Sequence, residues 1–72
     1  MTRADLENWF TYHAPRPDQL PKYEAIRAAA LVFAEVVVQN TPPSADQSVA
    51  IRKIREATMI ANASIACERH DD

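Results

Sequence analysis

Proline and glycine usage constrains this chain more than any other feature of its sequence. Glycine is absent, which excludes tight glycine turns and the usual left-handed glycine at the end of a helix. The five prolines fall in two clusters: Pro15, Pro17 and Pro21, then Pro42 and Pro43. Because proline breaks helices, the two clusters mark two breaks and leave two long runs in which helices can form.

A short helix is predicted near the amino terminus. Thr2 followed by Asp5 resembles a capping box, with Asp in place of Glu, and predicts a helix over about residues 3–10. Residues 11–20 should form an extended loop, because the prolines disfavour helical geometry in the residues before them.

Two long helices are predicted over about residues 21–39 and 45–69. Pro21 suits a first helical turn, and Ser44 to Gln47 reads as a second capping box. Apolar residues recur at spacings of three and four in both runs. Their similar lengths and short connection predict an antiparallel hairpin, so the expected fold is all-α, with residues 1–72 as a single helical-hairpin domain.

The size of the chain predicts self-association. A core of 72 residues stabilises a fold by only a few kcal/mol, so small domains often need a cross-link or a partner subunit. Cys67 is the single cysteine, so no intrachain disulfide can form, and no metal-binding spacing is present. The helix predicted over 21–39 is apolar around more of its circumference than one neighbour covers. We therefore expect a homo-oligomer.

Charge and motifs exclude several classes of function. The formal net charge of −2 argues against a binder of DNA or RNA polymers. The longest apolar run, residues 28–34, is too short to cross a membrane, and no signal peptide is visible, so we expect a cytoplasmic protein. No catalytic triad order, carboxylate pair or glycine-rich phosphate loop is present. We expect neither an enzyme nor a bound metal or cofactor.

The segment from Phe10 to Arg16 is the most informative local feature. Phe10, Thr11, Tyr12 and His13 place two rings, a hydroxyl and an imidazole close to the Arg16 guanidinium. Aromatic faces stack on nucleobases, and Tyr and Arg donate to phosphate oxygens. The same segment can instead cap the hairpin, with Phe10 and Tyr12 in the core.

Three segments in this order resemble the phage anti-CBASS cyclic-nucleotide sponges, which share their hairpin with some anti-Thoeris sponges. They are Phe-Thr-Tyr-His at 10–13, Tyr-Glu-Ala-Ile-Arg at 23–27 and Ala-Asn-Ala-Ser-Ile-Ala at 61–66. The resemblance implies a hexamer that binds cyclic dinucleotides such as 3′,3′-cGAMP. Some members also bind cyclic trinucleotides at separate sites. Such proteins sequester the messenger uncleaved in the host bacterial cytoplasm and so block CBASS immunity during phage infection.

The resemblance also implies roles for particular residues. Tyr12 matches the phosphate-binding tyrosine, and Arg27 of a neighbouring subunit matches its basic partner, with Lys22 as second choice. Phe10 and His13 should line or stack on the bases. Many relatives have Arg where this chain has Cys67, and Arg69 follows two residues later. The candidate ligand-binding residues are Tyr12, Arg27, Phe10, His13, Lys22, Thr11 and Arg69.

Two other functions remain open at this stage. The apolar excess of residues 25–38 also suits a protein-interaction module, such as a phage regulator that docks its apolar helix face on a host protein. A sponge for an ADP-ribose-type signal is the other alternative.

Overall fold

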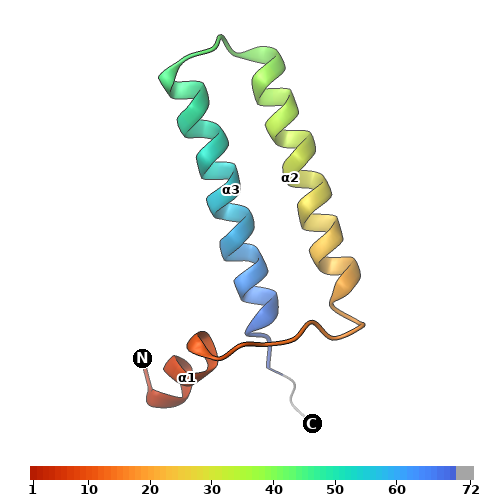
Figure 1. Ribbon diagram of the computed structural model, residues 1–72, viewed down its shortest axis with the longest axis vertical. Helices are drawn as coiled ribbons and strands as arrows, with labels where there is room; N and C mark the ends of the chain where they lie inside the picture. Colours follow the sequence, from red (N-terminus) through yellow and green to blue (C-terminus); the bar gives the residue numbers. More distant parts are fainter. Residues whose placement is uncertain (70–72) are drawn as a thin grey trace.

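The computed structural model describes residues 1–69, which form three helices and no strand. Helix α1 spans Arg3–Phe10, α2 spans Leu20–Asn40 and α3 spans Ala45–Ala66. The two long helices lie side by side and antiparallel, and α1 lies beyond the end of α3 (Figure 1). The predicted all-α hairpin with a short leading helix is therefore confirmed.

Helix α3 ends earlier than the sequence predicted, at Ala66 and not near Arg69. The chain tightens at this point, because the backbone N–H of Glu68 donates to the carbonyl of Ile65 three residues back, at 3.1 Å. Such three-residue bonds are common where an α-helix closes its last turn. The residues after Ala66 therefore leave the helix axis and meet the amino-terminal part of the chain.

Of the two predicted capping boxes, the one that begins α1 is complete and the one that begins α3 is only half formed. The Thr2 hydroxyl accepts from the Asp5 N–H, and the Asp5 carboxylate accepts from the Thr2 N–H, so this capping box is complete. At α3, the Ser44 hydroxyl accepts from the Gln47 N–H at 3.1 Å. The Gln47 amide does not return the bond to Ser44. It donates to the carbonyl of Thr41 at 3.2 Å, where α2 has just ended and carbonyls lack helical partners.

Removing the Ser44 hydroxyl tests this cap. Ser44→Ala is expected to lower the free energy of unfolding by about 1 kcal/mol, because the Gln47 N–H loses its acceptor. Urea unfolding at fixed protein concentration measures the change. Ser48→Ala is the matched control, since Ser48 lies exposed inside the helix and alanine is the better helix former there. Equal stability of Ser44→Ala and Ser48→Ala would contradict the assigned cap.

The helix ends are closed by side chains, as a chain without glycine requires. At the end of α2, the Asn40 amide donates to the carbonyl of Val36 and the Thr41 hydroxyl to that of Val37, both at 2.7 Å. No residue among 1–69 has a positive φ angle. Polar side chains therefore take the place of the glycine caps that helices commonly use.

The hairpin is a single layer of helices. Residues 1–69 measure 48 × 27 × 16 Å, and the smallest dimension is little more than the thickness of one helix, about 10–12 Å. Consequently no apolar side chain in this part of the chain is fully buried. The seam between α2 and α3 consists of partly buried side chains, among them Ile26, Val37, Ile54 and Ile65.

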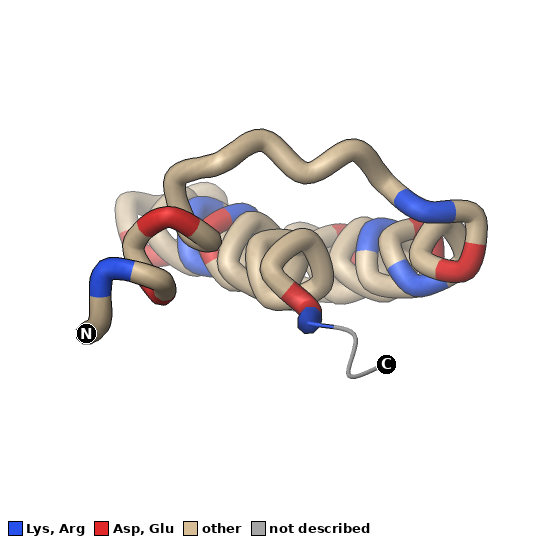
Figure 2. Tube along the Cα trace, turned by 90° about the horizontal axis from the view of Figure 1, so that it is seen from below, with Lys and Arg blue, Asp and Glu red and all other residues tan. Residues whose placement is uncertain are grey.

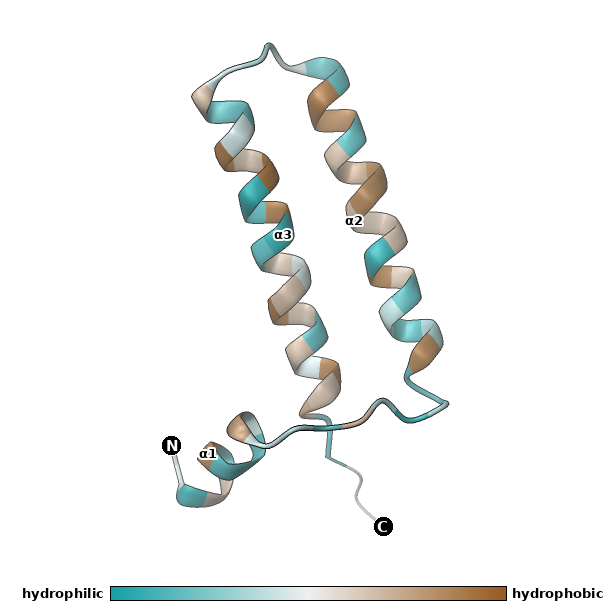
Figure 3. Cartoon of the chain, viewed as in Figure 1, coloured by the Kyte–Doolittle hydropathy of each residue, from teal (hydrophilic) through white to brown (hydrophobic). Residues whose placement is uncertain are grey.

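Large apolar side chains also lie away from that seam. Hydrophobic residues recur along the whole of α2 (Figure 3). Leu31, Val32 and Phe33 follow one another around the helix, and each is about 60% exposed, at 61%, 58% and 58%. One antiparallel neighbour thus leaves much of the apolar surface of α2 in contact with water. None of the helices within residues 1–69 has the length and apolarity needed to span a bilayer.

Candidate functional site

The crossing loop, residues 11–19, joins α1 to α2 across the open end of the hairpin (Figure 1). Viewed from that end, the loop carries no charged residue until Arg16, shortly before α2 begins (Figure 2). The loop therefore brings an aromatic and uncharged polar segment to one end of the molecule, next to the ends of both long helices.

Tyr12 stands exposed between two residues that cap α1. The Thr11 hydroxyl donates to the carbonyl of Glu7, and the His13 Nε2 lies 2.6 Å from the carbonyl of Asn8. Since a carbonyl only accepts, Nε2 carries the proton in this contact. These two bonds turn the neighbours of Tyr12 back onto the last turn of α1.

The rings of Phe10 and Tyr12 do not fill the core. They are 83% and 85% exposed, so the alternative in which this segment buries both rings is wrong. With no third layer over the hairpin, the loop has no apolar interior in which to place them. Both rings are available to a ligand or to another subunit.

The predicted basic residues differ in their partners. Lys22 Nζ lies 3.4 Å from a carboxylate oxygen of Glu68, and Arg69 Nη2 lies 2.8 Å from Asp5 Oδ1. Arg27 is exposed on α2 and, among the described residues, has no ion-pair or hydrogen-bond partner. No hydrogen bond joins Arg27 to Tyr12 among the described residues.

The pKa of the Glu68 carboxyl lies below its ordinary value of 4.5. The side-chain amide of Gln19 contributes most to this lowering, followed by the ammonium of Lys22. The pKa of Asp5 is likewise lowered, first by the backbone N–H of Thr2. A carboxyl whose pKa is lower in the folded protein than in the unfolded chain stabilises the fold at higher pH.

Acid should therefore weaken the fold through Glu68. Its contribution is complete above pH 4.5 and is lost as the pH falls through its lowered folded pKa. Urea unfolding at several pH values between about 3 and 6 should show the free energy of unfolding falling towards acid. Glu68→Gln should reduce that slope, while the part due to Asp5 remains. An unchanged slope in Glu68→Gln would show that Glu68 has no such linkage.

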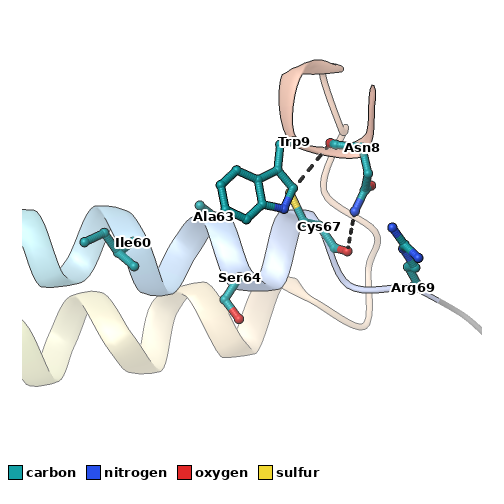
Figure 4. Close-up of a pocket in the computed structure, with 7 residues that line it drawn as sticks. All are labelled: Asn8, Trp9, Ile60, Ala63, Ser64, Cys67 and Arg69. Atoms are coloured by element: carbon teal, nitrogen blue, oxygen red, sulfur yellow. Dashed lines mark hydrogen bonds between the residues drawn. The ribbon is translucent and has the colours of Figure 1, made fainter. Parts of the chain in front are cut away.

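A cavity of about 600 Å³ opens between α1 and the outer side of α3 (Figure 4). Its lining is mainly apolar and consists of Asn8, Trp9, Ile60, Ala63, Ser64, Cys67 and Arg69. The volume lies in the range of small-molecule sites. Arg69 is the only predicted site residue on its wall. The free thiol of Cys67 is partly buried and lies 3.7 Å from the Asn8 carbonyl.

Two residues that connect the loop to the hairpin were not predicted from the sequence. Gln19 is 2% exposed, and its amide donates to the carbonyl of Ile65 at 2.9 Å. The amide of Asn8 donates to the carbonyl of Cys67 at 3.1 Å. Neither contact has a local sequence signal, because each joins residues far apart in the chain. Within residues 1–69, no three His, Cys, Asp or Glu side chains gather as metal ligands would.

Comparison with known proteins identifies one family. The family model described as Acb2/Tad1, hairpin domain, matches residues 2–66. The match runs from the capping residue of α1 to the last residue of α3, so it covers all three helices. It is the sponge family that the three ordered sequence segments predicted. No curated protein and no solved structure shows significant similarity to the chain.

Proposed function

The chain belongs to the Acb2/Tad1 hairpin-domain family, and from this premise we propose that it is a non-enzymatic sponge for cyclic dinucleotides such as 3′,3′-cGAMP. It would bind the messenger made by a bacterial immune cyclase and hold it uncleaved. The effector of CBASS immunity would then lack its activator in the cytoplasm of a phage-infected host.

The pair Tyr12 and Arg27 carries this proposal. Both side chains are exposed and, among the described residues, neither has a hydrogen-bond or ion-pair partner. A tyrosine hydroxyl and a guanidinium are suitable donors to a phosphate oxygen. Lys22 is the weaker candidate, because its ammonium already pairs with Glu68. An exposed ion pair of this kind stabilises little, so Lys22 can still assist.

A site shared between subunits fits both the residues and the ligand. Since Tyr12 and Arg27 are not joined within one chain, we propose that Arg27 of a neighbouring subunit completes the site of Tyr12. A two-fold axis between copies would present the pair twice. A cyclic dinucleotide has two phosphates and two bases, and the exposed ring of Phe10 can stack on a base. Assembly into a hexamer would supply several such sites and cover the apolar surface of α2.

Thr11 and His13 have a more indirect place in this proposal. Both already donate to carbonyls of α1, so their polar atoms act first as helix caps. They would line the site from either side of Tyr12 without supplying its main phosphate contacts. Arg69 would contribute only to a separate site at the cavity beside α3, after release of Asp5. Cyclic trinucleotides are the ligand class to test there.

Calorimetric titration tests the proposed function. The assembled protein is titrated with 3′,3′-cGAMP, other cyclic dinucleotides, cyclic trinucleotides and an ADP-ribose derivative. We expect at least one cyclic dinucleotide to bind with a Kd well below 1 mM. A Kd of about 1 mM corresponds to a binding free energy of about −4 kcal/mol. If no cyclic dinucleotide binds more tightly than that, the proposal is wrong. Tight binding of the ADP-ribose derivative alone would assign the sponge to that other signal.

The exposed apolar surface of α2 favours one alternative function. A protein-interaction module would keep this surface free for a host protein, whereas the sponge covers it by self-association. Light scattering separates the two. A stable monomer would favour the interaction module and contradict a site built between subunits.

A further inference from the structure

Two carbonyls at the end of α3 accept from side chains on either side of Tyr12, one in α1 and one at the last residue of the crossing loop. On the α1 side, the Asn8 amide donates to the carbonyl of Cys67. On the α2 side, the Gln19 amide donates to that of Ile65. Helix ends need such donors, and here they come from residues 59 and 46 positions away in the chain. The end of α3 is therefore joined to the chain on both sides of Tyr12, through Asn8 in α1 and through Gln19 at the end of the crossing loop.

Asn8 and Gln19 also bond to the loop itself. The carbonyl of Asn8 accepts from His13, the residue next to Tyr12. The side-chain oxygen of Gln19 accepts from the backbone N–H of Arg16 at 3.0 Å. Each residue thus holds α3 with its amide N–H and the loop with an oxygen. Figure 4 shows the Asn8 amide reaching the carbonyl of Cys67 beneath α1.

Gln19 does not behave as the residue before a helix usually does. It occupies the capping position of α2, yet its side chain makes no capping bond to that helix. It is instead the one fully buried side chain among residues 1–69, and its amide joins α3 to the loop. A buried amide is costly without partners, so its two bonds define one placement of this end of the loop.

We propose that Asn8 and Gln19 are positioning residues that set the place of Tyr12 for ligand binding. This inference rests on the proposed function, because it requires Tyr12 to bind the ligand. Neither Asn8 nor Gln19 is assigned a contact with the ligand. Each joins the chain on one side of Tyr12 to the end of α3, so that Tyr12 meets the phosphate from a preformed loop. Without these bonds the loop must be ordered during binding, and that ordering weakens affinity.

Gln19→Ala tests the proposal, with Gln47→Ala as the matched control. Gln47 also joins two helices through its side-chain amide, which donates to Thr41 at the opposite end of the hairpin. Both variants should lower the melting temperature. Only Gln19→Ala should weaken the affinity for 3′,3′-cGAMP, by about tenfold or more. In this variant the loop and one or two of its side chains must be ordered during binding, and that cost lowers the affinity. Gln47→Ala should bind within about twofold of the unaltered protein.

A second measurement works without ligand. Heteronuclear NOE values of the backbone amides of residues 11–14 report fast motion of the loop. They should fall in Gln19→Ala and stay unchanged in Gln47→Ala. Asn8→Ala should likewise lower the NOE values of residues 11–14, because it removes the bond on the other side of Tyr12. It replaces Gln19→Ala in both measurements if Gln19→Ala does not fold. Both readouts apply to the oligomer as purified.

The outcomes are separable from those of the proposed function. If the unaltered protein binds no cyclic dinucleotide, the proposed function fails, while the NMR result still decides whether these residues hold the loop. If the unaltered protein binds and Gln19→Ala binds equally well, the positioning role is wrong. Equal weakening by Gln19→Ala and Gln47→Ala would overturn it too, because a general loss of stability would then explain the effect.

Discussion

Tyr12→Ala and Arg27→Ala are each expected to weaken the binding of 3′,3′-cGAMP by about 100-fold or more. A hydrogen bond to a charged group contributes about 1.5–3 kcal/mol. In a site on a two-fold axis each substitution removes two such bonds from one ligand, or about 3 kcal/mol at the lower limit. Since about 1.4 kcal/mol corresponds to tenfold in affinity, the loss reaches two orders of magnitude. Calorimetric titration of the purified variants measures the loss.

Both variants should keep the fold, which makes the result interpretable. Tyr12 is 85% exposed, and neither side chain has a partner among the described residues whose loss would destabilise the protomer. Tyr12→Phe separates the hydroxyl from the ring, because it keeps the aromatic face. Arg52→Ala is the matched control for Arg27, since Arg52 is an exposed arginine on α3. Unchanged affinity in both Tyr12→Ala and Arg27→Ala would place the site elsewhere.

Val32→Glu is expected to prevent the proposed self-association and, as a result, to destabilise the fold. Val32 is 58% exposed and lies about 200° around α2 from Ala30, which faces the seam with α3. Assembly would bury this position against another copy. An unpaired carboxylate there costs several kcal/mol in every subunit. Because no apolar side chain among residues 1–69 is fully buried, a dissociated chain would have little core to stabilise its fold.

Light scattering and circular dichroism at one protein concentration test this prediction. Val32→Glu should have a lower mass and a lower melting temperature than the unaltered protein. Ser48→Glu adds the same charge at an exposed position of α3 and should change neither. An oligomer of unchanged mass in Val32→Glu would show that this side of α2 is not covered by another copy.

The helices were predictable because their signals are local. Two proline clusters, the Thr2 capping box and the apolar spacing of the long runs were enough to place all three helices. The predictions that were wrong, the second capping box and the end of α3, depend on which of several hydrogen-bond partners a group reaches. The Gln47 amide reaches the carbonyl of Thr41 and not Ser44, because that carbonyl is left unpaired where α2 ends. Similarly, α3 ends at Ala66, where the carbonyl of Ile65 accepts from the backbone N–H of Glu68 and also from the Gln19 amide, a residue far away in the sequence.

The candidate site was predictable only in its residue types. Tyr12 and Arg27 could be predicted as site residues because their segments resemble those of the sponge family. The structure adds that both side chains are exposed. The roles of Asn8 and Gln19 could not be read from the sequence, because their contacts link segments 59 and 46 residues apart. No spacing rule predicts which distant carbonyl an amide will reach. The exposure of Phe10 and Tyr12 was equally hidden, since it follows from the single-layer shape of the hairpin.

Release of intact messenger from the denatured protein distinguishes sequestration from cleavage. A known amount of 3′,3′-cGAMP is incubated with the protein, and the free messenger is quantified by mass spectrometry before and after heat denaturation of the protein. We predict that free messenger disappears in proportion to the number of binding sites and returns chemically unchanged once the protein is denatured. Messenger that stays free throughout, or that returns only as linear or hydrolysed product, would contradict sequestration without cleavage.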